Sequence, residues 1–333
     1  MRRDAGRSTL TGIAAEAGVS VSTVSKVLNG RTDVAARTRD RVGSLLRSNG
    51  YRVASGLRFG AVDLLIGCLQ GPWAEELIRG AVEAAREADQ SIIVTTVETD
   101  AEFGHWLDRA AARGTGGVLS VLHLPSTAGR RRLSAAGIPL VVIDPPTEPG
   151  TGIRSVGTTN WQGGMAATRH LAELGHRRIA AIGGPERFWS ANARLDGYRT
   201  ALLRSGLPVD EALIGRDEFS DVGGKIQALR LLDLPERPTP IVAGNDNQAF
   251  GVLQALGERG LRAPDDLSVV GFDDVLATWA TPPLTTVRQP LAAMAATGFR
   301  MLRMGADGSP AQPEHIELAT TLVIRNSTAP PRR

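Results

Sequence analysis

The chain of 333 residues is poor in several residue types, and each shortage excludes a class of protein. With one cysteine, Cys68, it has no internal disulfide, and it lacks the spaced Cys and His residues of a zinc site. We expect Cys68 to be a small buried side chain. Aromatic residues make up only 4% of the chain, but a hydrophobic share of 42% over this length is enough for two or three packed domains.

Long apolar runs are also missing. No stretch approaches the ~18 uncharged apolar residues of a membrane-spanning helix, and the basic segment from Met1 to Arg7 is not followed by the apolar core of a signal peptide. We therefore expect neither export nor membrane insertion, and we predict a cytoplasmic location.

Charge is unevenly distributed along the chain. The net charge is +3, but residues 1–60 hold 11 Lys and Arg against 4 Asp and Glu, whereas the other 273 residues hold 27 against 31. The basic end is therefore the part expected to meet a polyanion such as nucleic acid. The alternative is a solvated basic tail, which charge alone does not exclude.

The basic end carries helical order that a tail would not have. Thr9 is a candidate N-cap, and Gly18 is a stop signal at the end of the first helix. Ser20 can cap a second helix, and a third is expected over about 36–49. The predicted inward residues are Leu10, Ile13, Ala14, Ala17, Val21, Val24, Leu28, Val42, Leu45 and Leu46. Ser22, Thr23, Ser25 and Lys26 are left outside, as in a helix-turn-helix that enters a major groove.

The stretch "LTGIAAEAGVSVSTVSKVLNGRTDVAARTRDRV" resembles the N-terminal signature of the LacI/GalR family of bacterial repressors. The resemblance implies a DNA-binding domain over residues 1–50, in which Val21, Ser22 and Lys26 touch base edges. For the other DNA-binding positions it implies phosphate contacts or helix capping: Thr9, Ser20, Thr23, Ser25 and Asn29.

The linker at 51–60 departs from the family pattern. A Pro-Asn pair is missing and the segment is about three residues short, although "VASGLR" matches the end of the family's hinge helix. Leu57 is then the candidate for a side chain that wedges into the minor groove. Gly56 weakens any helix there by about 1 kcal/mol relative to alanine, so a tether without a hinge helix is the alternative.

The rest of the chain alternates apolar strands with helical stretches. "AVDLLIGCL", "SIIVTTV", "GVLSVLHL" and "PLVVID" form one series, and "IAAIGG", "PIVAGND" and "LSVVGFDD" form a second after Arg154. Such βαβ repetition predicts two similar lobes, each a parallel sheet covered by helices on both faces. The fold class is thus a small all-α helix-turn-helix head followed by a two-lobed α/β core.

The resemblance extends over the core through "RSVGTTNWQGG", "LGHRRIAAIGG", "ARLDGY", "AGNDNQA", "LSVVGFDD" and "PPLTTVRQP". It implies a periplasmic-binding-protein-like core over 61–333 that binds a ligand and dimerises, with three chain crossings between the lobes. We place lobe 1 at about 61–156 and 287–313, and lobe 2 at about 157–286 and 314–328.

Ligands of parallel sheets bind beyond the carboxyl ends of the strands, here between the lobes. By resemblance Arg194 holds ligand hydroxyls or carboxylates, with a surface ion pair to Asp196 as the alternative, and Asp273 accepts hydrogen bonds from ligand hydroxyls. Asn245 is favoured over Asp246, and Asp144 and Gln289 are further candidate contacts. Four tryptophans are predicted to lie in loops that line the cleft and to stack on sugar rings: Trp73, Trp161, Trp189 and Trp279.

These features predict a transcriptional repressor that binds a pseudo-palindromic double-stranded operator as a homodimer and is released by a small sugar. A nucleobase-corepressed regulator of the same fold is the nearest alternative. An exported sugar-binding protein would lack the helical head. A sugar-processing enzyme would use Asp144 and Asp273 as an acid/base pair, but no nucleophile elbow, P-loop or metal-ligand cluster supports one, so we predict no enzyme, no cofactor and no metal.

Overall fold

The structure is a computed structural model that describes residues 9–28, 34–49, 51, 61–67, 69, 71–304 and 314–332. Two predicted DNA contacts, Asn29 and Leu57, lie outside the described residues, as do Cys68 and the linker apart from Tyr51.

The head has three helices whose ends follow the predicted signals: α1 (Leu10–Ala17), α2 (Val21–Leu28) and α3 (Ala36–Ser48). The Thr9 side chain accepts a hydrogen bond from the backbone N–H of Gly12, and Gly18 takes the left-handed conformation with φ of 60°. Ser20 Oγ accepts from the backbone N–H of Thr23 at 3.1 Å. The N-cap at Thr9, the stop at Gly18 and the cap at Ser20 are thereby confirmed.

A small apolar core holds these helices together, consisting of Ile13, Ala14, Ala17, Val24, Val27, Val34, Val42 and Leu46. The prediction that Val21 faces inward is wrong, because its side chain is 44% exposed while that of Val27 is buried. Val21 is the first residue of α2 and lies at the margin of the core, so the inward face of the helix is formed one turn later.

The core begins with a lobe of alternating strands and helices: β1 (Val62–Ile66), α4 (Pro72–Glu87), β2 (Ile92–Thr96), α5 (Asp100–Arg113), β3 (Gly117–Val121), α6 (Thr127–Ala135), β4 (Leu140–Ile143) and β5 (Ser155–Thr158). The second lobe comprises α7 (Asn160–Glu173), β6 (Ala180–Gly183), α8 (Trp189–Arg204), η1 (Glu211–Leu213), β7 (Ile214–Arg216), α9 (Asp221–Leu232), β8 (Pro240–Ala243), α10 (Asp246–Glu258), β9 (Ser268–Asp273), η2 (Ala277–Trp279) and β10 (Thr285–Arg288). Three further elements follow: α11 (Leu291–Met304), β11 (His315–Leu318) and β12 (Thr321–Val323).

Each lobe contains one six-stranded sheet. The strand order is β11-β5-β4-β3-β1-β2 in the first and β12-β10-β9-β8-β6-β7 in the second. Every pair within the first sheet is parallel, and in the second only the β10–β12 pair is antiparallel. The predicted class, a helical head followed by a two-lobed α/β core, is confirmed.

The lobe boundaries differ from those expected. β11 pairs with β5 in the first sheet, whereas residues from 314 onward were placed in lobe 2. β10 pairs with β9 along its length, so residues 287 and 288 belong to the second sheet. The last crossing therefore lies between β11 and β12, because β11 completes the edge of the first sheet before the chain returns.

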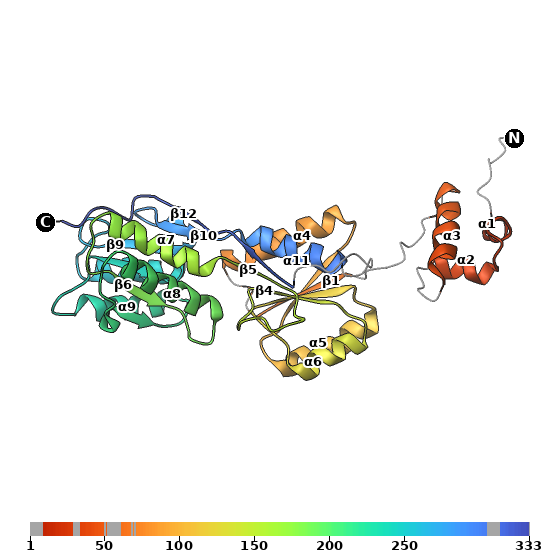
Figure 1. Ribbon diagram of the computed structural model, residues 1–333, viewed down its shortest axis with the longest axis horizontal. Coiled ribbons are helices and arrows are strands. Elements are labelled where there is room, and N and C mark those ends of the chain that lie inside the picture. Colours follow the sequence, from red (N-terminus) through yellow and green to blue (C-terminus); the bar gives the residue numbers. More distant parts are fainter. Residues whose placement is uncertain are drawn as a thin grey trace.

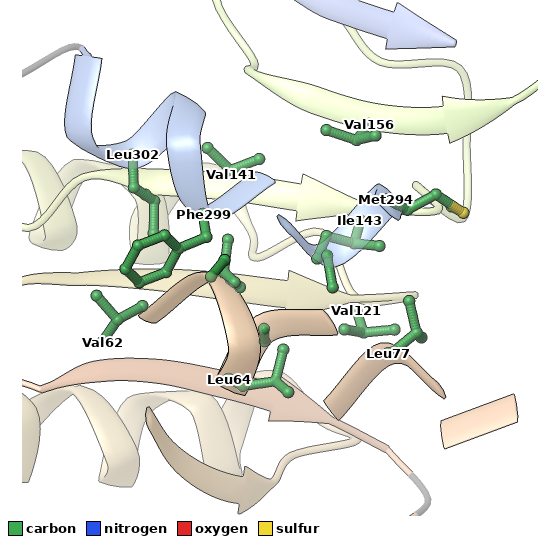
Figure 2. Close-up of a cluster of buried hydrophobic side chains, with 14 of the residues drawn as sticks. Val62, Leu64, Leu77, Val121, Val141, Ile143, Val156, Met294, Phe299 and Leu302 are labelled. Atoms are coloured by element: carbon green, nitrogen blue, oxygen red, sulfur yellow. The ribbon is translucent and has the colours of Figure 1, made fainter. Parts of the chain in front are cut away.

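Helices cover both faces of each sheet, as a near-continuous apolar strand pattern requires. On the first sheet, α4 and α11 pack on one face and α5 and α6 lie on the other (Figure 1). Figure 2 shows Leu77 of α4 and Phe299 and Leu302 of α11 over strand residues such as Leu64 and Val141. On the second sheet, α9 and α10 cover one face, and α7 and α8 cover the other. These rigid layers fix where the strand ends point.

The helices α7 and α8 approach each other unusually closely through glycines. A Cβ at Gly164 would overlap the carbonyl oxygen of Arg194, and one at Gly197 would overlap the carbonyl oxygen of Trp161. Glycine removes the side chain that would otherwise separate the two backbones. This contact sets the position of α8, the helix that carries Arg194 into the inter-lobe region.

Candidate functional site

A cleft of about 680 Å³ lies between the two lobes. It is lined by residues at the carboxyl ends of strands from both sheets, as parallel sheets predict. Its first-lobe lining includes Trp73, Glu98, Leu122, His123 and Asp144. Its second-lobe lining includes Arg187, Phe188, Ser190, Arg194, Phe219, Asn245, Asn247 and Asp273.

Arg194 is the central cation of this cleft. Its Nε donates to Asn160 Oδ1 at 2.8 Å and its Nη1 donates to the Gly244 carbonyl at 2.6 Å. Nη1 also lies 3.8 Å from Asp273 Oδ1, and the guanidinium carbon is 3.8 Å from the centre of the Phe272 ring. The side chain is buried, so its fork has one fixed direction. Arg194 forms no surface ion pair with Asp196, which pairs instead with Arg199.

Two buried carboxyl groups face this cation. Burial raises the pKa of Asp273 to about 7, and the nearby Arg194 charge opposes that rise. Burial likewise raises the pKa of Asp144 to about 6, again against Arg194. Within the described part of the chain the Asp144 carboxyl makes no hydrogen bond. It is therefore an acceptor available to a ligand hydroxyl.

The backbone at these strand ends is held in an uncommon conformation. Leu122, Asp144, Asp273 and Asp274 have φ angles of 54°, 48°, 108° and 62°. A non-glycine residue in this region costs of order 1–3 kcal/mol and persists where the surrounding fold over-determines it. The first three line the cleft, so three of the five non-glycine positions with positive φ among the described residues lie at the candidate binding site.

Of the neighbouring residues Asn245 and Asp246, Asn245 lines the cleft and Asp246 does not, as predicted. Asn245 lines the cleft and caps α10, with Oδ1 accepting from the Gln248 N–H at 2.8 Å. Asp246 is buried behind it, where it accepts from Thr286 Oγ1 and from the N–H groups of Val275 and Leu276. Asp246 thus stabilises the loop after β9.

Of the four tryptophans predicted to line the cleft from loops, only one lines it, and none of the four lies in a loop. Trp73 lines it, but from the first turn of α4. Trp161 lies in α7 over Arg204, and Trp279 is 78% exposed in η2. Trp189 begins α8 and reaches the other lobe, with its backbone N–H bonded to Pro146 and its ring beside that of His315. A helix turns by about 100° per residue, so the neighbours of a cleft residue point elsewhere.

Two phenylalanines supply ring faces in the cleft where tryptophans were expected. Phe188 and Phe219 line the cleft with ring centres 6.2 Å apart and an interplanar angle of 27°. They lie shortly after the carboxyl ends of β6 and β7, which is the signal that would have found them in the sequence. The same signal applies to His123, which follows β3, and to Glu98, which follows β2.

Gln289 lies behind Asp273 and not in the cleft lining. It borders a smaller cavity of about 350 Å³, together with Asp274, Arg288 and Arg325. Its side-chain amide donates to Asp273 Oδ1 at 2.6 Å. Gln289 therefore reaches a ligand only through Asp273.

The raised pKa of Asp273 predicts that the free energy of unfolding depends on pH. Between its ordinary pKa of 3.8 and about 7, the folded protein keeps a proton on Asp273 that the unfolded chain has lost. The folded state then binds more protons, so this group lowers the free energy of unfolding as pH rises through that window. Asp273→Asn removes the effect.

Urea unfolding between about pH 4.5 and pH 8 measures how the free energy of unfolding of the wild type and of Asp273→Asn depends on pH. The difference in unfolding free energy, variant minus wild type, should grow with pH and level off above the pKa. A difference that is constant across this range would show that Asp273 has an ordinary pKa.

The head presents a compact polar surface on α2. Val21, Ser22 and Lys26 are exposed, whereas Thr23 and Ser25 are half-buried. Ser20 Oγ lies 2.8 Å from the hydroxyls of both Ser22 and Thr23, which orders the start of the helix. An α-helix with polar side chains on its exposed face can enter a major groove.

A helix-turn-helix head joined to a two-lobed core with an inter-lobe cleft defines a ligand-responsive DNA-binding regulator. Residues 9–53 match the bacterial regulatory proteins of the lacI family, and residues 168–328 match the periplasmic binding protein-like domain. The chain is 32% identical over 337 residues to the HTH-type transcriptional regulator DegA of Bacillus subtilis, covering 97% of this chain and 99% of that protein.

Solved structures agree with this assignment. A transcriptional regulator CelR–cellobiose complex matches with a TM-score of 0.74 and 31% identity, covering 96% of this chain and 99% of that one. The lac repressor dimer bound to operator and the anti-inducer ONPF matches with a TM-score of 0.73 and 26% identity, over 97% and 99%. The chain belongs to the lacI family and is a DNA-binding transcriptional regulator. Among the described residues, no helix is long and apolar enough to span a bilayer.

Proposed function

We propose that this regulator is a repressor that binds a pseudo-palindromic operator as a homodimer and is released by a neutral sugar, a disaccharide or short oligosaccharide in preference to a single ring. The observation that carries the proposal is the cleft itself, in which Arg194, Asp144 and Asp273 converge between aromatic side chains. Such a mixture of directed polar groups and ring faces suits an alcohol-rich ring compound.

The charge balance of the cleft favours a neutral ligand. Arg194 lies opposite two carboxyl groups, and Arg187 at the rim is paired with Glu218 through two hydrogen bonds of 2.8 and 2.9 Å. A phosphate or carboxylate ligand would meet acceptors as well as donors. Hydroxyl groups can donate to the carboxyl groups and accept from Arg194.

The size of the cleft favours more than one sugar ring. Its volume of about 680 Å³ lies near the middle of the range of about 300–1,000 Å³ for small-molecule sites. Trp73 lies in the first lobe, whereas Phe188 and Phe219 lie in the second, so ring faces are offered at both sides. The similar CelR structure is a complex with cellobiose.

A ligand panel tests this function. Thermal unfolding of the full chain with cellobiose, other disaccharides, monosaccharides and purines should show stabilisation by a disaccharide, about 2.7 kcal/mol at a concentration 100 times Kd. The same sugar should weaken binding to a genomic DNA fragment that the protein retains. Stabilisation by a purine alone, with tighter DNA binding, would instead establish a nucleobase corepressor stacked on Phe188 and Phe219.

Lys26→Ala tests the DNA-binding surface. If Lys26 reads a base edge, the variant should bind the operator about 1–3 kcal/mol more weakly and discriminate less between operator and random duplex. Fluorescence anisotropy at fixed salt measures both affinities. Lys225→Ala is the matched control, since that lysine is in α9 and pairs with Glu258. An unchanged preference for operator would remove Lys26 from the readout surface.

A further inference from the structure

The two lobes are joined by three chain crossings, which lie between β5 and α7, between β10 and α11, and between β11 and β12. Any rotation of one lobe against the other must be absorbed at these segments, because the sheets and their helices are rigid layers. Ligand binding in the cleft is therefore converted into a change in lobe geometry at these crossings.

Asp273 connects the cleft to the second crossing. Its Oδ1 accepts from Nε2 of Gln289 at 2.6 Å, and its backbone carbonyl accepts from the Gln289 N–H at 3.2 Å. Gln289 directly follows β10, and its side chain is buried. The position of the Asp273 carboxyl is therefore tied to the backbone and side chain of this crossing.

Gln289 continues the connection to the first crossing. Its Oε1 accepts from Thr158 Oγ1 at 2.7 Å, and Thr158, the last residue of β5, is only 1% exposed. When Asp273 is ionised, one amide orientation satisfies both partners, because the carboxylate only accepts and the hydroxyl of Thr158 can donate. Both ends of the Gln289 amide are thus bonded inside the protein and point to neither solvent nor cleft.

The next residue reaches the third crossing. The Thr159 N–H donates to the Leu318 carbonyl at 3.0 Å, and Thr159 Oγ1 accepts from the Thr320 N–H at 2.9 Å. Thr320 Oγ1 donates back to the Thr159 carbonyl at 3.1 Å. Hydrogen bonds, together with the peptide link from Thr158 to Thr159, therefore connect one cleft carboxyl to all three crossings.

We propose that Gln289 and Thr158 are positioning residues that transmit ligand contact at Asp273 to the three lobe crossings. We call Asp273, Gln289 and Thr158 the hinge relay. The role in effector response rests on the proposed function, whereas the physical connection does not. A ligand hydroxyl that draws the Asp273 carboxyl toward the cleft lengthens or turns its bond to Gln289, and Thr158 and Thr159 must follow.

Thr158→Val is the most specific test of the hinge relay, because it removes the hydroxyl and keeps the shape of the side chain. The full chain is measured for cellobiose affinity and for operator affinity with and without saturating cellobiose. Wild-type coupling in such systems is roughly 5- to 150-fold. The variant should bind cellobiose and free operator within about threefold of wild type, while the cellobiose effect on operator affinity falls toward onefold. Gln289→Ala should have the same effect.

Two controls separate transmission from a general loss of stability. Thr158→Ser retains the donor and should restore the cellobiose effect. Thr168→Val removes another buried threonine hydroxyl, one that donates to the Gly164 carbonyl within α7, and should leave the effect intact. The double variant Thr158→Val with Gln289→Ala should lose no more coupling than either single variant. Additive losses would overturn the relay.

Amide hydrogen exchange tests the connection without any ligand. Thr158→Val and Gln289→Ala should speed exchange at the Thr159 and Thr320 amides, and Thr168→Val should not. If cellobiose and the rest of the sugar panel leave the wild type unaffected, the proposed function fails, and exchange alone decides the relay. Unchanged exchange at both amides overturns the relay even where the sugar response is present.

Discussion

Arg194→Met should abolish the effector response, with a loss of sugar affinity of roughly 100-fold or more. The guanidinium bonds Asn160 Oδ1 and the Gly244 carbonyl, and it is the cation that Asp144 and Asp273 face. A hydrogen bond to a charged group contributes about 1.5–3 kcal/mol, so the loss of one or two such bonds to ligand hydroxyls gives a loss of affinity of that order. Methionine fills the space against Phe272 without supplying a donor.

Calorimetry with the sugar that stabilises the wild type most measures the Arg194→Met effect. Arg194→Lys keeps the charge but not the planar fork, so it should bind with intermediate affinity. Arg199→Met is the matched control, because Arg199 lies on the same helix and pairs with Asp196 and Glu211. Operator binding without sugar should be preserved in all three variants. Wild-type sugar affinity in Arg194→Met would show that the ligand is held elsewhere.

Gly164→Ala should destabilise the folded protein by about 3 kcal/mol. The added Cβ would overlap the Arg194 carbonyl, which is backbone, so α7 and α8 must move apart. Overpacking a close contact typically costs 1–3 kcal/mol and more where backbone must shift. Displacement of α8 also moves Arg194, so sugar affinity should fall together with stability.

Urea unfolding of Gly164→Ala and Gly257→Ala gives the comparison. Gly257 lies near the end of α10, where an added Cβ would meet no described atom within 4 Å. Alanine there should stabilise the protein by roughly 0.5–1 kcal/mol, since it has the better helix propensity. Equal effects of the two substitutions would show that helix propensity, and not the close α7–α8 approach, governs Gly164.

Short-range patterns in the sequence were enough to predict the helices of the head and the two series of strands. Capping at Thr9 and Ser20 and the left-handed turn at Gly18 depend on neighbouring residues alone, so they follow directly from residue type. The carboxyl ends of strands were also predictable. That rule correctly placed Asp144, Asn245 and Asp273 around one cleft, because parallel strands bring these ends to one edge.

Sequence patterns did not predict which aromatic side chains face the cleft. Trp189 lies between the cleft residues Phe188 and Ser190, and Trp161 follows Asn160, the partner of Arg194, yet both tryptophans face other surroundings. Which side of a helix faces the cleft depends on how the helix is rotated on its sheet. That rotation is set by packing across α7 and α8, including the approach at Gly164, and no local pattern encodes it.

The sequence by itself determined the helix-turn-helix, the two βαβ series and the strand-end positions of Asp144 and Asp273, because these depend on local backbone preferences and on the 2- and 3.6-residue periodicities. Only the tertiary structure decided that β11 closes the first sheet, that Phe188 and Phe219 line the cleft while three of the predicted tryptophans do not, and that Gln289 lies between Asp273 and Thr158. These contacts join residues up to 160 positions apart, and their partners are selected by the packing of whole layers.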